Sequence, residues 1–428
     1  MKYYKRVLKN KLTIIEVPST DAESVVVDFF VKTGSRSETA KENGISHFLE
    51  HFLFKGTKKY PSAMAITELV DGIGGEMNAN TGKEHTQYFI KAHHSRLEMI
   101  FDILTDMIQN PLLDKPELER EKGVIVEEIN MYKDSPRAVV GNLLEEIMWP
   151  KQALGRDIAG APETVTKFTQ AMFRSYLERH YQTGNIILGI SGKYDRKKLN
   201  QLIKKYWEKV PSKKFHIWDY SKNGQNAPRV AVKFKDTQQA HFDLGFKSFG
   251  YEDKRGKAAA VLSSLLGGGM SSRLFTEIRE KRGLAYYVRA GQSAYIDTGV
   301  FDISAGVQVA KLEEAVSVTL DELSKIKQGD ISDKELLKAK EYIKGKTTIY
   351  LEDNQARLDW FLEQTAFKKE VKTPAQVFKE IDSVTKADVV KVAKDLFVPN
   401  KLSFAVVGPY KKPVETKIMK IVQAWAKR

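Results

Sequence analysis

The chain has 428 residues, a length that excludes a single small module and predicts two or more domains. Its 42% hydrophobic and 29% charged residues are close to the averages of globular proteins, which excludes a disordered, collagen-like or coiled-coil chain. The net charge of +14 predicts a solvated lysine-rich surface rather than a nucleic-acid partner, because the lysines are scattered and no nucleic-acid-binding motif is found.

Cysteine is absent from the sequence. This excludes disulfides, thiolate zinc sites and a cysteine nucleophile, so any metal must be bound by His and carboxylate side chains. The first residues carry charge but no apolar run of signal-peptide length, and no stretch of about 18 apolar residues follows. From these features we predict a cytoplasmic protein that does not interact with a membrane.

The first half of the chain alternates strand and helix patterns. Strands are predicted where β-branched and aromatic residues cluster, and helices where apolar residues recur with a helical period. The predicted strands are Thr13–Val17, Ser24–Val31, His85–Ala92 and Asn185–Ser191, and the predicted helices are Gly44–Phe54, Ala63–Ile73, Leu97–Ile108, Lys115–Tyr132 and Thr169–Tyr181. This order predicts an α+β fold in which helices cover a mainly antiparallel sheet.

The regular pattern fails at residues 211–228, where polar residues and glycine indicate an exposed linker. We therefore predict an N-terminal domain of residues 1–210 and a C-terminal domain of residues 229–428. Within the C-terminal domain the patterns resume, with strands at Val230–Phe234 and His241–Phe246 and helices at Gly256–Leu266 and Arg273–Arg282.

The second half of the chain repeats the first at low similarity. Gly44 aligns with Gly256 and Leu53 with Leu265, and further matches follow in the same order at a nearly constant offset. Ordered matches of this kind favour an internal duplication over chance. The sequence therefore predicts two related domains of similar size.

A short motif in the predicted helix Gly44–Phe54 carries metal-binding chemistry. Its residues are His47-Phe-Leu-Glu50-His51, so the two imidazoles lie four positions apart on one helix face, with Glu50 beside them. This His-x-x-Glu-His order is the inverted form of a zinc-peptidase motif. The alternative is a pair of helix histidines that are hydrogen-bonded to their neighbours.

A second acidic helix could complete such a site, since a hydrolytic zinc ion needs a third protein ligand. Glu121 and Glu128 lie seven residues apart on one face of this helix, and Val124, Ile125 and Ile129 are predicted to form an apolar stripe. One of the two carboxylates could bind the metal while the other supports it. The alternative is a charged, solvated helix face.

Three other segments have less specific patterns. Glycines, Asn78 and alternating Thr and Tyr over Gly74–Tyr88 are typical of an exposed edge strand that could pair with an extended peptide, or of an ordinary hairpin. The Gly267-Gly268-Gly269 run is predicted to end a helix. His93 and His94 are adjacent in a strand pattern, so we expect them to face opposite sides and not to share a metal.

The motif His47–His51 with its flanking residues, the segment Gly74–Tyr88, and Glu121 with Glu128 resemble the pitrilysin/insulysin family of zinc peptidases. The resemblance is closest to the half-size branch related to the mitochondrial processing peptidase. It extends to Ser272–Tyr286, which is similar to the second-domain signature of the family. The resemblance implies two homologous domains of the metallohydrolase/LuxS-like fold in a clam-shell arrangement.

The resemblance also implies roles for individual residues. One Zn²⁺ per chain would be bound by His47, His51 and Glu128, with Glu50 as the general base and Glu121 as the acid that orients the site. The residues implied to contact the substrate are Arg279, Tyr286, Asn78 and Ala79.

The repeated half lacks the metal motif. His47 aligns with Ala259, Glu50 with Leu262, His51 with Ser263, and Glu128 with Lys346. Only the N-terminal domain is therefore predicted to bind the metal.

We predict a zinc metalloendopeptidase that hydrolyses extended peptides or unfolded segments. In relatives of this length two chains form the reaction chamber, so the resemblance implies a homodimer or a heterodimer with a related half-size chain. The alternative is a non-catalytic assembly subunit of the same fold, but such subunits typically have degraded metal motifs, whereas this motif is intact.

Overall fold

The computed structural model describes residues 1–213, 219–411 and 413–427, which form two compact units. Each unit is assembled from three segments of the chain. The first unit contains Met1–Asn130, Arg156–Asp219 and Tyr350–Lys372, and the second contains Met131–Gly155, Tyr220–Ile349 and Thr373–Arg428. The sequence predicts one change of domain, at residues 211–228, and does not predict the two exchanged segments.

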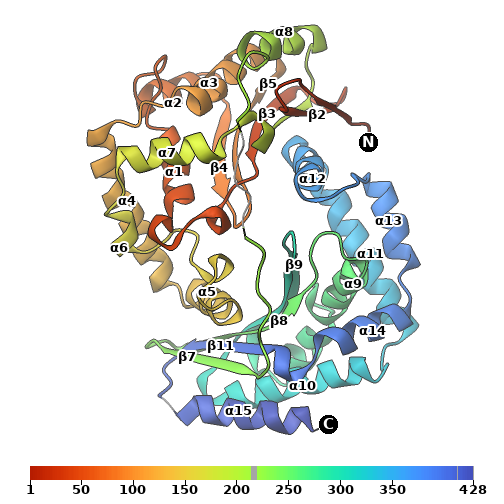
Figure 1. Cartoon of the computed structure of the whole chain (residues 1–428). Helices are drawn as coiled ribbons and strands as arrows, with labels where there is room; N and C mark the ends of the chain where they lie inside the picture. Colours follow the sequence, from red (N-terminus) through yellow and green to blue (C-terminus); the bar gives the residue numbers. More distant parts are fainter. Residues whose placement is uncertain (214–218, 412, 428) are drawn as a thin grey trace. The chain divides into compact units, whose positions relative to one another are not determined.

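The first unit is built on a six-stranded sheet with the order β1-β2-β6-β3-β5-β4 (Figure 1). Neighbouring strands are antiparallel except β2 and β6, which are parallel. β3 is almost entirely buried, as expected for a central strand made of Val and Phe. The strands are β1 (Tyr4–Val7), β2 (Thr13–Pro18), β3 (Ser24–Val31), β4 (Glu76–Thr81), β5 (Thr86–His93) and β6 (Ile186–Gly192).

Helices cover both faces of this sheet. In the main core of the unit, α3 packs on β3 and β5, and the apolar side of α1 packs beside β4 and β5. The other face is covered by α12, which contacts β2, β3 and β6. The helices are α1 (Ile45–Leu53), α2 (Ala63–Asp71), α3 (Leu97–Gln109), α4 (Lys115–Asp134), α6 (Pro162–Val165), α7 (Gln170–His180), α8 (Arg196–Tyr206) and α12 (Asn354–Phe367).

The second unit contains a five-stranded sheet with the order β7-β11-β8-β10-β9. Figure 1 shows α5 on one side of β7 and β11 and α15 on the other, in agreement with the contacts of both helices. The strands are β7 (Arg229–Phe234), β8 (Gln239–Ser248), β9 (Ala285–Ala294), β10 (Gly299–Gln308) and β11 (Leu402–Gly408). The helices are α5 (Pro136–Met148), α9 (Gly256–Gly267), α10 (Leu312–Lys327), α11 (Asp333–Tyr350), α13 (Pro374–Ser383), α14 (Lys386–Leu396) and α15 (Pro413–Ala426).

The two sheets have the same topology. Without β1, the order β2-β6-β3-β5-β4 corresponds strand by strand to β7-β11-β8-β10-β9, and each sheet has its one parallel pair in the same place. This correspondence supports the predicted internal repeat. The fold is therefore α+β in both units, as the sequence predicts, with mixed and mainly antiparallel sheets.

The two units exchange equivalent helices. α5 comes from the first half of the chain and packs on the sheet of the second unit, where Leu144 lies against Gly245. α12 comes from the second half and packs on the first sheet, where Leu358 lies against Gly189. A side chain at either glycine would meet these leucines at about 3 Å, so the glycines permit the close approach of the exchanged helices.

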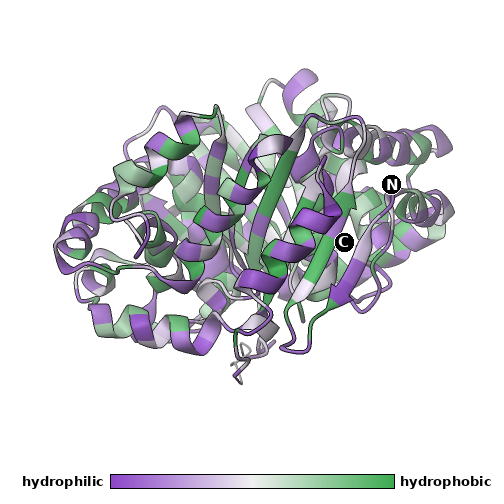
Figure 2. Cartoon of the chain, turned by 90° about the horizontal axis from the view of Figure 1, so that it is seen from above, coloured by the Kyte–Doolittle hydropathy of each residue, from purple (hydrophilic) through white to green (hydrophobic). Residues whose placement is uncertain are grey.

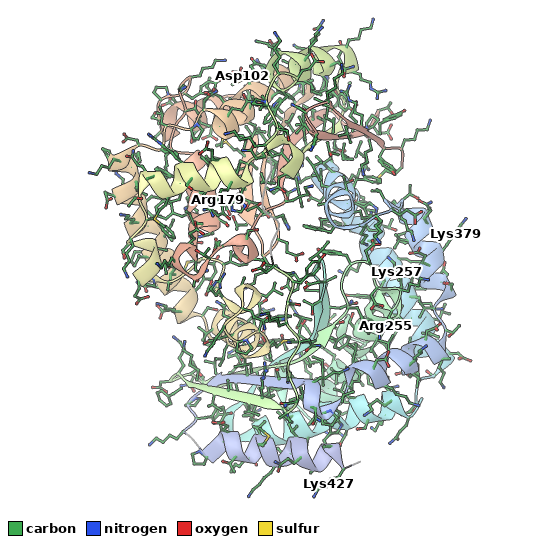
Figure 3. All side chains as sticks on the ribbon, in the orientation of Figure 1. Asp102, Arg179, Arg255, Lys257, Lys379 and Lys427 are labelled. Atoms are coloured by element: carbon green, nitrogen blue, oxygen red, sulfur yellow. The ribbon has the colours of Figure 1, made fainter. Side chains whose placement is uncertain are left out.

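The distribution of apolar and charged residues matches the layers of helix and sheet. In Figure 2 the strands are mostly green, whereas the helices alternate between green and purple faces, as amphipathic helices on an apolar sheet do. Lys379 on α13 and Lys427 after α15 are exposed and extend from separate helices (Figure 3). No helix in the described part of the chain combines the length and the apolarity that crossing a bilayer requires.

The predicted helix over Arg273–Arg282 is present, and its residues Phe275–Glu280 form a π-helix. One local prediction is wrong. His93 and His94 do not face opposite sides of a strand, because β5 ends at His93 and a 3-10 turn begins at His94. Their ring centroids lie 4.3 Å apart. The run Gly267–Gly269 ends α9, as predicted.

Candidate metal centre

The helix α1 is held at its N-terminus by a buried carboxylate. The backbone N–H groups of Gly44 and Ser46 donate to Glu38, each at 2.8 Å, and satisfy donors that have no partner within the helix. Gly44 has a φ of 98° and abuts Gly160 so closely that a Cβ on either residue would collide with backbone. Burial raises the pKa of Glu38 to about 7, although these hydrogen bonds oppose the shift. Sequence reasoning missed Glu38, which lies outside the motif.

The two histidines of α1 lie side by side on its polar face. The ring centroids of His47 and His51 are 4.8 Å apart, which is the spacing that a one-turn separation gives. Phe48, Leu49 and Phe52 point the other way, into the core of the first unit. The apolar face thereby fixes the direction in which both imidazoles point.

The helix α4 brings its two glutamates to the same histidines. Its buried residues Leu118, Glu121, Ile125 and Ile129 follow one another along a single face, and Val124, predicted to be apolar and inward, is 47% exposed instead. Glu128 Oε1 lies 3.6 Å from His47 Nε2, and Glu128 Oε2 lies 3.3 Å from His51 Nε2. Three possible ligands from two helices therefore converge.

Glu121 contacts the opposite side of the His51 ring. Its Oε1 lies 3.0 Å from His51 Nδ1, and its Oε2 lies 2.7 Å from the ammonium of Lys55. A proton held on Nδ1 by this carboxylate leaves Nε2 unprotonated and able to bind a metal. Sequence reasoning missed Lys55, although it follows His51 by one helical turn. His47 Nδ1 is buried and has no such partner among the described residues.

The pKa values of His47, Glu121 and Glu128 are shifted by hydrogen bonds and charges from neighbouring side chains. Burial would lower the pKa of His47, but the hydrogen bond and negative charge of Glu128 outweigh it and raise the pKa. The hydrogen bond with His47 lowers the pKa of Glu128 despite partial burial. Burial would raise the pKa of Glu121, but His51 and Lys55 lower it. Both carboxylates are therefore held in the ionised form.

The donor set fits a zinc ion. Two imidazoles and one carboxylate form the His₂Glu set of catalytic zinc sites, and their ligand atoms all lie within 4.8 Å of one another. Zinc bonds of about 2.0–2.1 Å in a tetrahedron place neighbouring ligand atoms about 3.3–3.4 Å apart. His47 Nε2 and His51 Nε2 lie 3.6 and 3.3 Å from different oxygens of Glu128, so the carboxylate reaches both imidazoles at about this separation.

Glu50 lies beside the cluster and contacts the edge strand β4. Thr81 Oγ1 donates to Glu50 Oε2 at 2.5 Å, which fixes the carboxylate. β4 is the outer strand of the first sheet and pairs only with β5 in the described structure. The segment 74–88 is thus both an edge strand and part of a hairpin. Asn78 is exposed on β4, whereas Ala79 is half-buried.

Arg279 and Tyr286 belong to the second unit and contact each other. The guanidinium of Arg279 lies 5.5 Å from the centroid of the Tyr286 ring and 4.8 Å from that of Phe275. Tyr286 is 71% exposed at the beginning of β9. Its hydroxyl and the guanidinium are both hydrogen-bond donors, and their contact with a substrate stays a prediction.

Comparison with family models gives two matches that together span most of the chain. Residues 14–162 match the model of insulinase (peptidase family M16), which covers the His47, His51 and Glu128 cluster. Residues 167–343 match the model of the peptidase M16 inactive domain. The second match covers Ala259 and Ser263, which align with His47 and His51.

Curated relatives and solved structures agree with these matches. Zinc proteases described as uncharacterized, from Streptomyces coelicolor and Bacillus subtilis, are each 33% identical to the chain and cover 94% of it. The alignments cover 89% and 97% of those proteins. A protease from Helicobacter pylori, 26% identical, superposes with a TM-score of 0.88 over 95% of this chain and 99% of its own. A peptidase M16 inactive domain structure from Pseudomonas fluorescens, 16% identical, has the same fold with a TM-score of 0.88 over 96% of this chain and 98% of its own.

Proposed function

Because the chain belongs to the insulinase (M16) family of peptidases, we propose that it is a zinc-dependent endopeptidase that hydrolyses extended peptides or unfolded segments. The observation that carries the proposal is the convergence of His47, His51 and Glu128 with Glu50 beside them. The relatives that are named zinc proteases support the choice of metal.

In this proposal His47, His51 and Glu128 hold one zinc ion. When bound, zinc would polarise the scissile carbonyl and lower the pKa of a water molecule. Glu121 acts on His51, whose Nδ1 lies 3.0 Å from the Glu121 carboxylate, and keeps the ring in the metal-binding tautomer. Lys55 in turn holds Glu121 at 2.7 Å, so the supporting carboxylate is itself fixed.

Glu50 is the general base. Its carboxylate accepts a proton from the attacking water as the new carbon–oxygen bond forms. The same proton then passes to the amine as the carbon–nitrogen bond breaks, so Glu50 returns to its ionised form. The hydrogen bond from Thr81 orients the carboxylate for both transfers.

The edge strand β4 gives the substrate a place to bind near Glu50. An extended peptide can add to an unpaired strand edge through backbone hydrogen bonds, which do not depend on its sequence. Thr81 joins β4 to Glu50, so a peptide along β4 would pass the general base. Asn78 and Ala79 would contact it there, and Arg279 and Tyr286 would donate hydrogen bonds to its backbone or reacting carbonyl.

The decisive experiment compares peptidase activity and zinc content in one preparation. We expect the wild type to cleave internal bonds of a mixed peptide library, to lose activity on chelation and to regain it with zinc. Glu50→Gln should retain zinc but lose cleavage, and Glu68→Gln, an exposed glutamate on α2, should behave like the wild type. Full activity after zinc removal would contradict the proposal. A chain with neither zinc nor cleavage would instead be a non-catalytic assembly subunit.

We propose in addition that the active form is a dimer, either of two copies or with a related half-size chain. The support is the resemblance to half-size peptidases alone. Mass measurement in solution at several protein concentrations tests it, and a monomer that retains full activity would exclude it.

A further inference from the structure

A second group of possible metal ligands lies in the first unit, away from Glu50 and its neighbours. In the part of the chain that the structure describes, Glu23, His93 and His94 also have ligand atoms within 4.8 Å of one another. They lie at the end of β5 opposite to Thr86, which pairs with Thr81. The eight residues of β5 separate the two ends by about 23 Å at the usual rise of a strand. The two groups therefore cannot share an ion.

One carboxylate oxygen of Glu23 lies near a nitrogen of each histidine. His94 Nε2 lies 3.4 Å and His93 Nε2 lies 3.9 Å from Glu23 Oε2. These separations are close to the 3.6 and 3.3 Å found between Glu128 and the two histidines of α1. The side chains are more exposed, at 68% for Glu23, 54% for His93 and 31% for His94, which leaves room for water to complete the coordination.

The backbone that carries these side chains is rigid. Ser24 at the start of β3 pairs with His93 at the end of β5, and Val25 pairs with Gly192 at the end of β6. The N–H of His94 also donates to the carbonyl of Glu23 at 3.0 Å. The three side chains are therefore carried by the paired ends of β3 and β5, with β6 alongside β3, and little ordering would be required on binding.

Lys193 supplies the positive charge in the structure without metal. Its ammonium donates to both oxygens of Glu23, at 2.8 and 2.9 Å. The hydrogen bond from Lys193 lowers the pKa of Glu23, so the carboxylate is ionised and available to a cation. A metal bound here would compete with Lys193 for one carboxylate oxygen.

The remaining nitrogen of His93 has a suitable partner. Its Nδ1 lies 2.9 Å from Ser95 Oγ, and the Ser95 N–H approaches the same nitrogen at 3.4 Å. In the metal-binding tautomer Nδ1 carries the proton and donates it to the hydroxyl, which leaves Nε2 free for the ion. This tautomer gives up only the longer of the two contacts.

We propose that Glu23, His93 and His94 form a second binding site for a divalent transition metal that favours imidazole ligands, such as Zn²⁺ or Ni²⁺. The site is weaker than that of His47, His51 and Glu128, because it is exposed and shares its carboxylate with Lys193. At limiting zinc the chain holds one ion, and at higher free zinc it holds two. Because the site links strand ends rather than the reacting groups, the proposal does not depend on peptidase activity.

The test measures bound metal by equilibrium dialysis against buffered free Zn²⁺, followed by elemental analysis. It uses the wild type, the double variant His47→Ala/His51→Ala, the double variant His93→Ala/His94→Ala, and the combination of all four substitutions. At the highest free zinc we expect two ions per chain in the wild type, one in each double variant, and none in the variant with all four substitutions. Repetition with Ni²⁺ should give the same pattern at the second site.

A matched pair of lysine variants sharpens the test. Lys193→Met should tighten the second site severalfold, whereas Lys198→Met should not, although Lys198 is similarly exposed and pairs with Glu98 at 3.1 Å. Glu23→Gln should weaken the second site by at least about tenfold. Wild type that binds one ion over the whole range, or a second ion that survives His93→Ala/His94→Ala, would overturn the proposal. Neither result would bear on the catalytic proposal, which the variant His47→Ala/His51→Ala tests separately.

Discussion

The two units carry the same strand order, but their equivalent helices do different chemistry. In the first unit α1 and α4 bring together His47, His51 and Glu128. In the second unit the aligned residues on α9 are Ala259 and Ser263, and Ala259 is fully buried in an apolar core. The same packing of a helix on a sheet therefore serves as a site in one unit and as core in the other.

The two units also differ in how their charged side chains are paired. Glu335 on α11 occupies the position of Glu117 on α4 and accepts two hydrogen bonds from Arg273 Nη2, both at 2.9 Å. Arg273 is only 9% exposed and also approaches Glu322 and Asp330 at 3.8 Å. In the second unit Glu335 is thus paired with a nearly buried arginine, whereas Glu117 at the aligned position of the first unit is paired with the exposed Arg120.

The largest expected effect is the difference between substitutions at two aligned positions, His51 on α1 and Ser263 on α9. His51→Ala should remove the zinc and lower kcat/KM by at least about 1,000-fold, since a ligand and the metal chemistry are lost together. Ser263→Ala removes only a hydroxyl that donates to the Ala260 carbonyl within its own helix, and should change neither zinc content nor activity. Peptide hydrolysis and elemental analysis of both variants check this. Comparable losses in the two variants would contradict the assignment of the site to the first unit.

The next effect concerns the buried ion pair of the second unit. Arg273→Met should lower the free energy of unfolding by about 2–3 kcal/mol, less than a fully buried pair would give because Glu335 is 30% exposed. The matched change Arg120→Met removes the partner of Glu117 on the exposed surface of α4 and should cost less than about 1 kcal/mol. Urea unfolding of both variants measures the difference. Equal costs would contradict a larger contribution from the buried pair than from the exposed one.

A smaller effect is expected at the residue that supports His51. Glu121→Gln should weaken zinc binding by about 10–100-fold, because the amide holds the Nδ1 proton less strongly than the carboxylate does. Glu119→Gln on the exposed side of α4 should leave the affinity unchanged. Competition with a chelator of known affinity gives both values. An unchanged affinity for Glu121→Gln would limit Glu121 to a structural role.

The last prediction concerns pH and a buried aspartate that each unit has on an equivalent strand. Asp243 on β8 and Asp28 on β3 occupy equivalent strand positions, pairing with Ala405 and Gly189, and both are buried. Burial raises the pKa of Asp243 from 3.8 to about 7, so the folded chain keeps a proton that the unfolded chain has lost. Stability should therefore fall as pH rises from about 4 to about 7, by up to about 1.4 kcal/mol per pH unit for this group.

Asp243→Asn tests this dependence on metal-free protein. The amide cannot ionise, so the variant should lose the part of the pH dependence that Asp243 contributes. Urea unfolding at three pH values between 4 and 7 measures the slope, and the wild type is the reference. A slope that is unchanged in Asp243→Asn would show that the carboxyl is already ionised in the folded chain.

Local patterns predicted much of the first unit. The strand at residues 24–31 and the helices around residues 45–53, 97–109 and 115–134 depend on the period and type of neighbouring residues, which the sequence displays directly. The exchanged helices α5 and α12 were not predicted, because the partner sheet of each lies in the other half of the chain. A helix was predicted at Phe275–Glu280 but its π type was not, since one inserted residue leaves little trace in periodicity.

The groups around His47 and around His93 show which features the sequence determines and which depend on the tertiary structure. The sequence by itself determined that His47 and His51 share a face, because a helix places residues four apart on the same side whatever surrounds it. It did not determine which carboxylate of α4 meets them, which depends on how two helices pack. The sequence misplaced His93 and His94: the two rings lie close together because the strand ends at His93 and a turn begins at His94. Glu23 lies near them only because β3 pairs with β5. Local geometry is encoded in nearby residues, whereas contacts between distant segments exist only once the sheet has formed.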